Sequence, residues 1–178
     1  MLRPKVSVDA IWDIDFSWLM GKGIRGLILD LDNTLVDWNR WEIRPEVASW
    51  MRAAAAKGLV FCVASNTREP ERLRAVAEQL GALWLLRAGK PLPRAYSRAM
   101  RLMGTAASET AVVGDQIFTD VLGGNLMGLM TIAVRPLSGR DFLGTKLARL
   151  GERLLSPWLF PRGRQSQPWD RSNRGGED

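Results

Sequence analysis

Short apolar runs alternate with longer amphipathic stretches over the first 137 residues. Five runs predict buried β-strands, at residues 24–29, 59–64, 82–86, 110–113 and 130–134. Three stretches predict helices because each has a proline near its start and a glycine directly after its end, at residues 45–57, 70–80 and 92–103. A further helical segment lies between the last two strands. The alternation predicts an α/β, Rossmann-like fold of three layers, with a central parallel sheet of about five strands and helices on both faces.

The pattern changes after residue 137, where leucines recur at helical spacing and basic side chains lie to one side of them. We therefore divide the chain into a domain at 1–137, a basic amphipathic helical segment at 138–160 that packs on or extends this domain, and a disordered tail at 161–178. The basic segment fits two interpretations. It is either a lid that packs on the sheet, or a peripheral contact with an anionic membrane through residues 140–164.

Composition narrows the chemistry that the chain can perform. Its 178 residues include no His and a single Cys, Cys62, which excludes Ser-His-Asp and Cys-His catalysis, an internal disulfide and a cysteine cluster for zinc. No apolar run approaches the roughly 20 residues of a membrane-spanning helix. No apolar leader follows the charged N-terminus, so a cytoplasmic protein is expected. The net charge of +6 favours anionic partners such as phosphorylated ligands, nucleic acid or acidic lipid.

Polar side chains gather where the predicted strands end. Asp30 and Asp32 follow the first strand, Ser65 and Asn66 the second, and Asp115 the fourth, with Asp120 one helical turn later and Lys90 just before the third helix. Because the carboxyl ends of parallel strands meet at one edge of a sheet, we expect these groups to converge. Clustered carboxylates repel one another unless they share a proton or a divalent cation lies between them, and without His or Cys ligands the expected ion is Mg²⁺. The set predicts a site for phosphoryl transfer.

Two of the carboxylates are assigned to the chemical steps. Asp30, at the end of a buried strand, is expected to attack phosphorus and form an aspartyl-phosphate. Asp32 would protonate the leaving alkoxide and then deprotonate the water that hydrolyses the intermediate.

The remaining side chains would bind the metal and the phosphate. Asp115 would ligate the metal, and Asp120 would ligate it as well or hold its water shell. Ser65, Asn66 and nearby backbone amides would bind the transferring phosphoryl group, while Lys90 would neutralise charge on the nucleophile and on the phosphate.

Four segments, DLDNTL, ASNT, GKP and GDQIFTD, occur in this order and resemble the four motifs of the haloacid dehalogenase (HAD) phosphatase superfamily. GIRGLILDLDNTLVDW, VVGDQIFTDVLGGNLMGLMTIAVRPL and TKLARLGER further resemble the YqeG-like group of HAD subfamily IIIA, over roughly residues 1–155. The characterised eukaryotic relatives of this group are phosphatidylglycerophosphate phosphatases. The resemblance implies the same roles for Asp30, Asp32 and Asp115, and it implies that Asp30, Asp115 and the backbone carbonyl of Asp32 coordinate Mg²⁺.

Superfamily members that act on small metabolites carry a cap domain inserted after the first or second motif. Here the sequence position advances by only 33 from Asp32 to Ser65 and by 25 from Ser65 to Lys90, which leaves room for a flap at 36–44 but for no cap. Trp38 and Trp41 of this flap fit either packing or substrate contact. An open site suits a phosphate carried by something large, such as a lipid at a membrane surface, a nucleic-acid end or a protein.

Together these features predict a Mg²⁺-dependent phosphomonoester hydrolase that dephosphorylates phosphatidylglycerophosphate to phosphatidylglycerol. One alternative is the same chemistry on a nucleic-acid end or on a sugar or nucleotide phosphate. Others are a basic RNA- or ribonucleoprotein-binding module with a vestigial site, and a phosphate-responsive switch with Asp30 as the acceptor. The intact Asp30, Asp32 and Asp115 argue against a vestigial site, and Asp32 as a neighbouring acid/base favours turnover over a switch. No pattern indicates the oligomeric state.

Overall fold

Six parallel strands form one sheet in the computed structural model, which describes residues 1–137 and 167–169. The strands are β1 (Val6–Val8), β2 (Gly26–Leu29), β3 (Val60–Ala64), β4 (Leu83–Leu85), β5 (Thr110–Gly114) and β6 (Met130–Val134), and they lie in the order β1-β6-β5-β2-β3-β4. The helices are α1 (Phe16–Gly21), α2 (Pro45–Ala56), α3 (Pro70–Gln79), α4 (Pro93–Met103) and α5 (Leu122–Leu126). Short 3-10 turns occupy Ile11–Asp13 and Ala107–Glu109, and a π-helical turn, η3, occupies Ile117–Val121.

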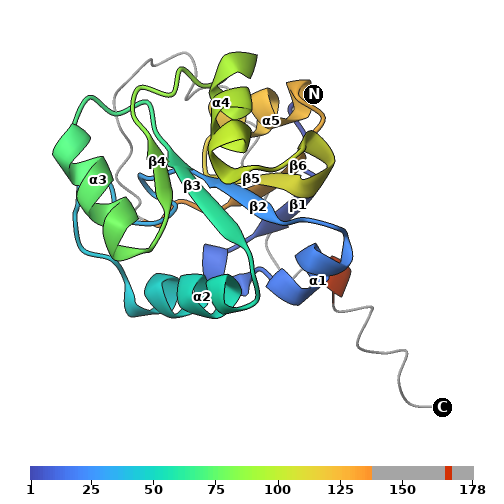
Figure 1. The fold of residues 1–178 in the computed structure, drawn as a ribbon, viewed down its shortest axis with the longest axis horizontal. Helices are drawn as coiled ribbons and strands as arrows, with labels where there is room; N and C mark the ends of the chain where they lie inside the picture. The colour runs from blue at the N-terminus through green and yellow to red at the C-terminus, as the bar shows by residue number, and fades with distance from the viewer. Residues whose placement is uncertain (138–166, 170–178) are drawn as a thin grey trace.

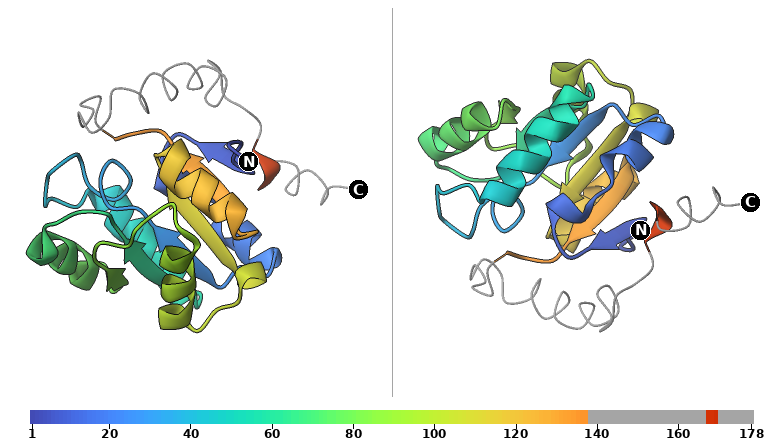
Figure 2. Two further views of the ribbon diagram at one scale, coloured as in Figure 1. Left: turned by 90° about the horizontal axis from the view of Figure 1, so that it is seen from above. Right: turned by 90° about the horizontal axis from the view of Figure 1, so that it is seen from below.

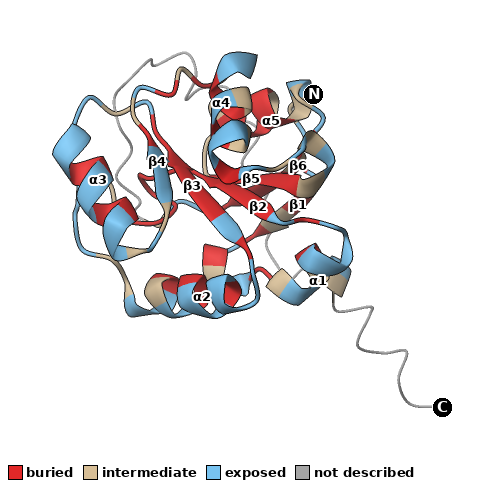
Figure 3. Cartoon of the chain, viewed as in Figure 1, coloured by how far each residue is buried: buried red, intermediate tan, exposed pale blue. Residues whose placement is uncertain are grey.

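The sheet forms the middle of three layers. In Figure 1, α4 and α5 lie above the sheet, while α1 and α2 lie below it. Successive residues of β2 point to opposite faces: Leu27 and Leu29 belong to the core on the α2 side, and Ile28 belongs to the core on the α4 side. Figure 3 shows the central strands as buried over most of their length, which is typical of a parallel sheet covered on both faces.

The predicted α/β fold of three layers is confirmed, with one strand more than expected. The additional strand, β1, has three residues and forms an edge of the sheet, where Val6 pairs with Ile132 of β6. Hydrophobic periodicity does not detect so short a run, and Pro4 and Lys5 directly before it interrupt the apolar pattern. The other strands and α2, α3 and α4 begin and end within two residues of their predicted positions.

The strand order reverses near the middle of the sheet. From β2 the chain moves outward through β3 and β4 and then returns to the other side of β2 as β5. α/β sheets bind ligands at such a reversal, beyond the carboxyl ends of the two strands. β2 and β5 pair in register from Gly26 and Thr110 to Leu29 and Val113, so the residues that follow each strand emerge at neighbouring positions.

Most of the predicted C-terminal organisation lies outside the described residues. This applies to the basic helical segment at 138–160, to the membrane contact through 140–164 and to most of the tail at 161–178. Among the residues that are described, no helix combines the length and the apolar character needed to cross a bilayer.

Residues 167–169 contact the domain, although the sequence predicts disorder there. Gln167 donates a hydrogen bond from its side-chain amide to the backbone carbonyl of Ser7 (3.1 Å). Trp169 packs edge to face on Trp18, with the ring centroids 5.4 Å apart. The indole of Trp169 provides apolar contact area that the neighbouring Gly, Arg and Ser residues lack, and composition averaged over the whole tail conceals it.

The contact between α4 and α5 yields a prediction about stability. The Tyr96 ring of α4 fills the space that a Cβ on Gly123 of α5 would occupy. Gly123→Ala is therefore expected to lower the free energy of unfolding by about 1–3 kcal/mol, as overpacking does. Denaturant titration measures this. The matched control is Gly21→Ala, whose Cβ would meet no atom within 4 Å. Equal destabilisation by both substitutions would contradict this packing.

Candidate active site

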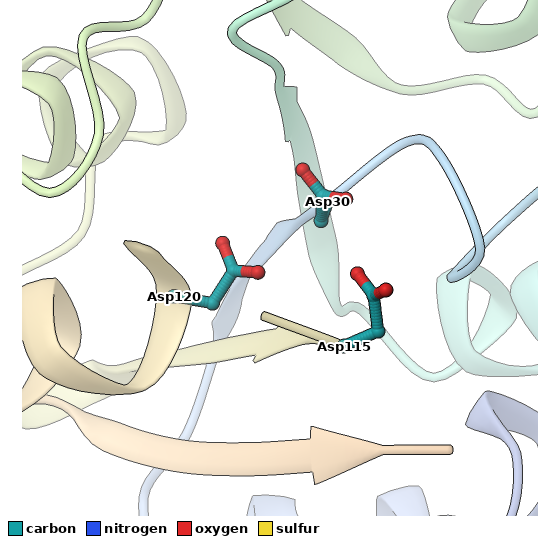
Figure 4. Close-up of side chains that lie close together, drawn as sticks. All are labelled: Asp30, Asp115 and Asp120. Atoms are coloured by element: carbon teal, nitrogen blue, oxygen red, sulfur yellow. The ribbon is translucent and has the colours of Figure 1, made fainter. Parts of the chain in front are cut away.

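Three carboxylates from separate elements converge beyond the carboxyl ends of β2 and β5. Asp30 directly follows β2, Asp115 directly follows β5, and Asp120 lies on η3. One oxygen of each carboxylate lies within 4.8 Å of the corresponding oxygens of the other two. Figure 4 shows the three side chains close together, with Asp120 on a helical turn. The convergence expected from the positions of these residues at strand ends is thus present in the structure.

Among the described residues, only Lys90 places its ammonium group in this cluster. Its Nζ donates to Oδ1 of Asp30 (2.5 Å) and to Oδ1 of Asp120 (2.7 Å), and its side chain is 2% exposed. Three carboxylates therefore share one nearby ammonium. Buried charges of like sign are costly unless further positive charge is present.

Burial and the excess of negative charge shift the pKa values of the cluster. Burial raises the pKa of Asp30 to about 7, against the opposing effect of Lys90 and with a further contribution from Asp120. The pKa of Asp115 is also raised well above its usual range, by burial first and then by the charges of Asp30 and Asp120. For Lys90, burial lowers the pKa, but Asp120 and Asp30 outweigh it and the pKa is raised. The ammonium is therefore fully charged at neutral pH.

Two oxygens of the cluster fit a metal ion. Oδ2 of Asp30 and Oδ1 of Asp115 are buried and have no hydrogen-bond donor in the described part of the chain. Buried polar atoms without partners are rare in proteins, and they indicate a ligand that completes the site. Carboxylate oxygens are the donors that hard divalent cations prefer, and a cation here would offset the excess negative charge. Asp30, Asp115 and Asp120 are thus suited to hold such an ion.

Local packing fixes the position of Asp120. In the π-helical turn, the Asp120 amide donates to the Gln116 carbonyl (2.9 Å), and the Gln116 amide donates back to Oδ2 of Asp120 (3.3 Å). A Cβ on Gly114 would overlap the Asp120 carboxylate, so glycine is required at the end of β5. Tyr96 donates from its hydroxyl to the Thr119 carbonyl (2.5 Å) and holds the turn from the α4 side.

Ser65 and Asn66, predicted to bind phosphate, lie where β3 ends. The Ser65 side chain is buried, and its Oγ accepts a hydrogen bond from the Thr67 amide (3.1 Å), which leaves the hydroxyl proton available as a donor. Oδ1 of Asn66 accepts bonds from the amides of Gly89 (2.9 Å) and Lys90 (3.0 Å), and its Nδ2 donates to the Lys90 carbonyl (2.9 Å). Asn66 thereby fixes the loop that carries Lys90, a role the sequence does not predict, while its contact with phosphate stays a prediction.

Asp32 lies apart from the acidic cluster. Its carboxylate binds Arg72 of α3 instead, with Nη1 to Oδ1 at 2.7 Å and Nη2 to Oδ2 at 2.8 Å. The predicted metal contact of Asp32 through its backbone carbonyl stays a prediction. Sequence reasoning misses Arg72 because an arginine in an amphipathic helix usually points to solvent. The one available signal is its position beside Leu73 and one turn before Val76, on the buried face of α3.

Residues 36–44, for which a flap is predicted, lie between Asp32 and α2 in the chain. Val36 forms isolated β-bridges with Asp32 and Ile43, and Arg44 forms an ion pair with Asp37 (2.9 Å). The Trp41 side chain is 52% exposed. In both panels of Figure 2 the flap, in blue, and α3, in green, lie side by side at one end of the molecule. Between Asp32 and Lys90 the described chain contains only this flap, α2, β3, α3 and β4, and therefore no inserted cap domain.

Comparison with known proteins adds independent findings. The family model described as haloacid dehalogenase-like hydrolase matches residues 37–128. The chain is 36% identical to "Probable phosphatase YqeG" of Bacillus subtilis, over 90% of this chain and 92% of that protein. It is 31% identical to phosphatidylglycerophosphate phosphatase 1 of Arabidopsis thaliana and 27% identical to that of Chlamydomonas reinhardtii. These alignments cover 88% and 87% of this chain but only 48% and 61% of the Arabidopsis and Chlamydomonas proteins.

Solved structures share the fold at low sequence identity. An uncharacterised protein from Listeria monocytogenes matches with a TM-score of 0.53 and 17% identity, over 75% of this chain and 98% of that one. A hydrolase of the haloacid dehalogenase-like family from Brucella suis matches with a TM-score of 0.52 and 15% identity, over 74% and 94% of the two chains.

The acidic cluster predicts a stabilising effect of Mg²⁺. Adding Mg²⁺ to metal-free protein is expected to raise the melting temperature at pH 7.5, because the ion binds the folded state only. Asp115→Asn should remove most of this increase. In the metal-free protein, this substitution should also raise the free energy of unfolding by about 1 kcal/mol or more, because it removes a buried charge with one oxygen that lacks a donor. Thermal unfolding with and without Mg²⁺ tests both. Asp9→Asn, at an exposed side chain, should change neither, and retention of the Mg²⁺ effect by Asp115→Asn would contradict the assignment.

The raised pKa of Asp30 predicts the pH dependence of the metal-free protein. The folded state holds a proton on Asp30 up to about pH 7, whereas the unfolded chain releases it near the ordinary value of 3.8. The free energy of unfolding should therefore fall as the pH rises through this window. In EDTA, denaturant titrations at pH 5 and pH 7.5 should show this fall, and it should be smaller in Asp30→Asn. An equal fall in both proteins would assign the dependence to other groups.

Proposed function

Because the chain belongs to the haloacid dehalogenase-like hydrolase family and is a phosphoric monoester hydrolase of its YqeG-like group, we propose that it hydrolyses its substrate with Mg²⁺ through a phosphorylated Asp30. The observation that carries this proposal is the arrangement of Asp30, Asp115 and Asp120 around Lys90, with one oxygen of Asp30 left without a donor. Lys90 binds Oδ1 of Asp30 and holds the side chain in place, so Oδ2 is available to react or to bind the metal.

In the first step, a carboxylate oxygen of Asp30 attacks the phosphorus atom and the bond from phosphorus to the leaving oxygen breaks. Asp32 donates a proton to that oxygen. In the second step, Asp32 takes a proton from water as the water attacks the phosphorus of the aspartyl-phosphate, which releases inorganic phosphate and regenerates Asp30. Ser65 and Lys90 would hold the phosphoryl oxygens in both steps.

Asp30, Asp115 and Asp120, together with the backbone carbonyl of Asp32, would hold Mg²⁺. When bound, Mg²⁺ supplies positive charge that offsets the negative charge of the phosphoryl oxygens. The ion would also bring Asp30 into its ionised form at neutral pH, because it opposes the effects that raise the pKa of this carboxyl.

The proposed substrate is phosphatidylglycerophosphate. The Arabidopsis and Chlamydomonas relatives carry this activity in their names, at 31% and 27% identity. The described chain has no cap over the site, and Trp41 on the flap is exposed, so a phosphate on a lipid headgroup could reach Asp30 while the lipid remains in its bilayer. We extend the proposal to a peripheral contact of residues 140–164 with the anionic membrane that presents this lipid.

Phosphate release from three substrates tests the reaction and the substrate together. With Mg²⁺ present, the protein is expected to hydrolyse phosphatidylglycerophosphate vesicles with a higher kcat/KM than a 3′-phosphorylated oligonucleotide or 4-nitrophenyl phosphate. Asp30→Asn should reduce kcat by about a thousandfold or more on each substrate, because the nucleophile is lost.

Asp9→Asn is the matched control for this experiment and should retain full activity, because the Asp9 side chain is exposed and pairs only with Arg135 among the described residues. Activity that survives in Asp30→Asn would overturn the mechanism. Activity that depends on Asp30 but favours the oligonucleotide would leave the mechanism intact and replace the lipid as the substrate.

A further inference from the structure

Arg72 extends from α3 into the interior and binds Asp32 with two parallel hydrogen bonds. The side chains of Arg72 and Asp32 are 3% and 9% exposed. The third nitrogen of the guanidinium, Nε, donates a hydrogen bond to the Glu69 carboxylate (2.8 Å). A guanidinium and a carboxylate paired in this way hold each other in a single orientation, because each of two nitrogens must remain aligned with one oxygen.

The hydrogen bonds to Asp32 leave one position for proton transfer. A carboxylate has about four acceptor positions, two on each oxygen. Oδ1 accepts bonds from Arg72 (2.7 Å) and from the Asn39 amide (3.1 Å), which uses both of its positions. Oδ2 accepts only the second Arg72 bond among the described residues. The remaining acceptor position is on Oδ2, so this atom is the one able to exchange a proton with a leaving group or a water.

The same contacts connect Asp32 to the flap. Arg72 donates a fourth bond, from Nη1 to the backbone carbonyl of Arg40 (3.3 Å), and Asn39, the preceding residue, donates its amide to Asp32. The flap therefore binds both members of the ion pair through its backbone. Movement of the flap would therefore change the orientation of the Asp32 carboxylate. Because the contacts use backbone groups, this coupling would depend little on which side chains the flap carries.

Arg72 is separate from the proposed phosphate-binding groups. Among the described residues its hydrogen-bond partners are Asp32, Glu69 and the Arg40 carbonyl, and none is Ser65 or Lys90. An effect of Arg72 on the reaction would therefore act through Asp32 and not through binding of the phosphate.

We propose that Arg72 is a positioning residue that orients Asp32 so that its Oδ2 performs the proton transfers, and that it couples this orientation to the flap. The proposal rests on the acid/base role proposed for Asp32. A purely structural role, in which Arg72 only neutralises two acidic neighbours, predicts a loss of stability without any dependence on the chemistry of the leaving group.

Substrates with different leaving groups separate these two roles. 4-Nitrophenolate leaves without a proton, whereas the alkoxide of glycerol phosphate needs one. Arg72→Lys keeps the positive charge but cannot form the two parallel hydrogen bonds to Asp32. In this variant, kcat/KM for glycerol phosphate should fall by about tenfold or more. The value for 4-nitrophenyl phosphate should change by less than about threefold, because kcat/KM reports the steps up to phosphoryl transfer.

Arg74→Lys is the matched control, because Arg74 lies on the same helix but is exposed and pairs with Glu78. It should leave both substrates unchanged. In Arg72→Lys, equal losses on the two substrates would overturn the proposal in favour of a structural role. A rise in KM with unchanged kcat would overturn it in favour of substrate binding.

A second variant covers the case in which Arg72→Lys does not fold. Glu69 is largely exposed and binds Nε of Arg72, so Glu69→Gln weakens the orientation of the guanidinium without creating an unpaired buried charge. It should show a smaller loss, of about twofold to threefold, confined to glycerol phosphate. No preference for either substrate would contradict the proposal. Asp30→Asn in the same assays reports separately on the phosphatase mechanism, since it should be inactive on both substrates.

Discussion

The arrangement of the candidate active site depends on buried negative charge that the described residues balance only in part. Asp30, Asp115 and Asp120 lie within reach of a single cation, and Lys90 is the only ammonium that the described chain brings to them. Burial first, and then the neighbouring carboxylates, raise the pKa values of Asp30 and Asp115, and one oxygen of each has no donor among the described residues. Such a site is costly when empty, and it favours ligands that supply positive charge. Mg²⁺ would satisfy this requirement, and it would also attract the phosphoryl oxygens of a substrate.

The parallel sheet makes such a concentration of charge possible. Its strand order reverses between β2 and β5, so the residues that follow these two strands emerge at neighbouring positions. Buried strands hold Asp30 and Asp115 rigidly, while the π-helical turn and the Asn66 contacts place Asp120 and the Lys90 loop against them. The stability of the three-layer core therefore maintains a site that would not hold together by its own interactions. The carboxylate of Asp32 is held by Arg72, and it would supply the proton transfers proposed for this site.

Much of this arrangement could be predicted from the sequence, because parallel strands bring the residues after their carboxyl ends to one edge. This rule alone places Asp30, Ser65 and Asp115 together, and the short spacing between motifs predicts the absence of a cap. The side-chain partners could not be predicted in the same way. Arg72 and Asn66 have ordinary positions in a helix and a turn, and only the three-dimensional packing reveals that they bind Asp32 and the Lys90 loop. β1 was missed for a different reason, since its three residues pair at a sheet edge that local periodicity does not report.

Asp30 is proposed to become phosphorylated during turnover, and identification of the phosphorylated residue tests this step. The protein would be mixed with Mg²⁺ and 4-nitrophenyl phosphate, quenched with acid within one turnover and digested, and the modified peptide would be located by mass spectrometry after borohydride reduction of the acyl phosphate. Phosphorylation of Asp30 is expected in the peptide that follows β2, and this modification should be lost when Mg²⁺ is removed. Phosphate release in the same reaction without a modified Asp30, or with the modification on another residue, would contradict it.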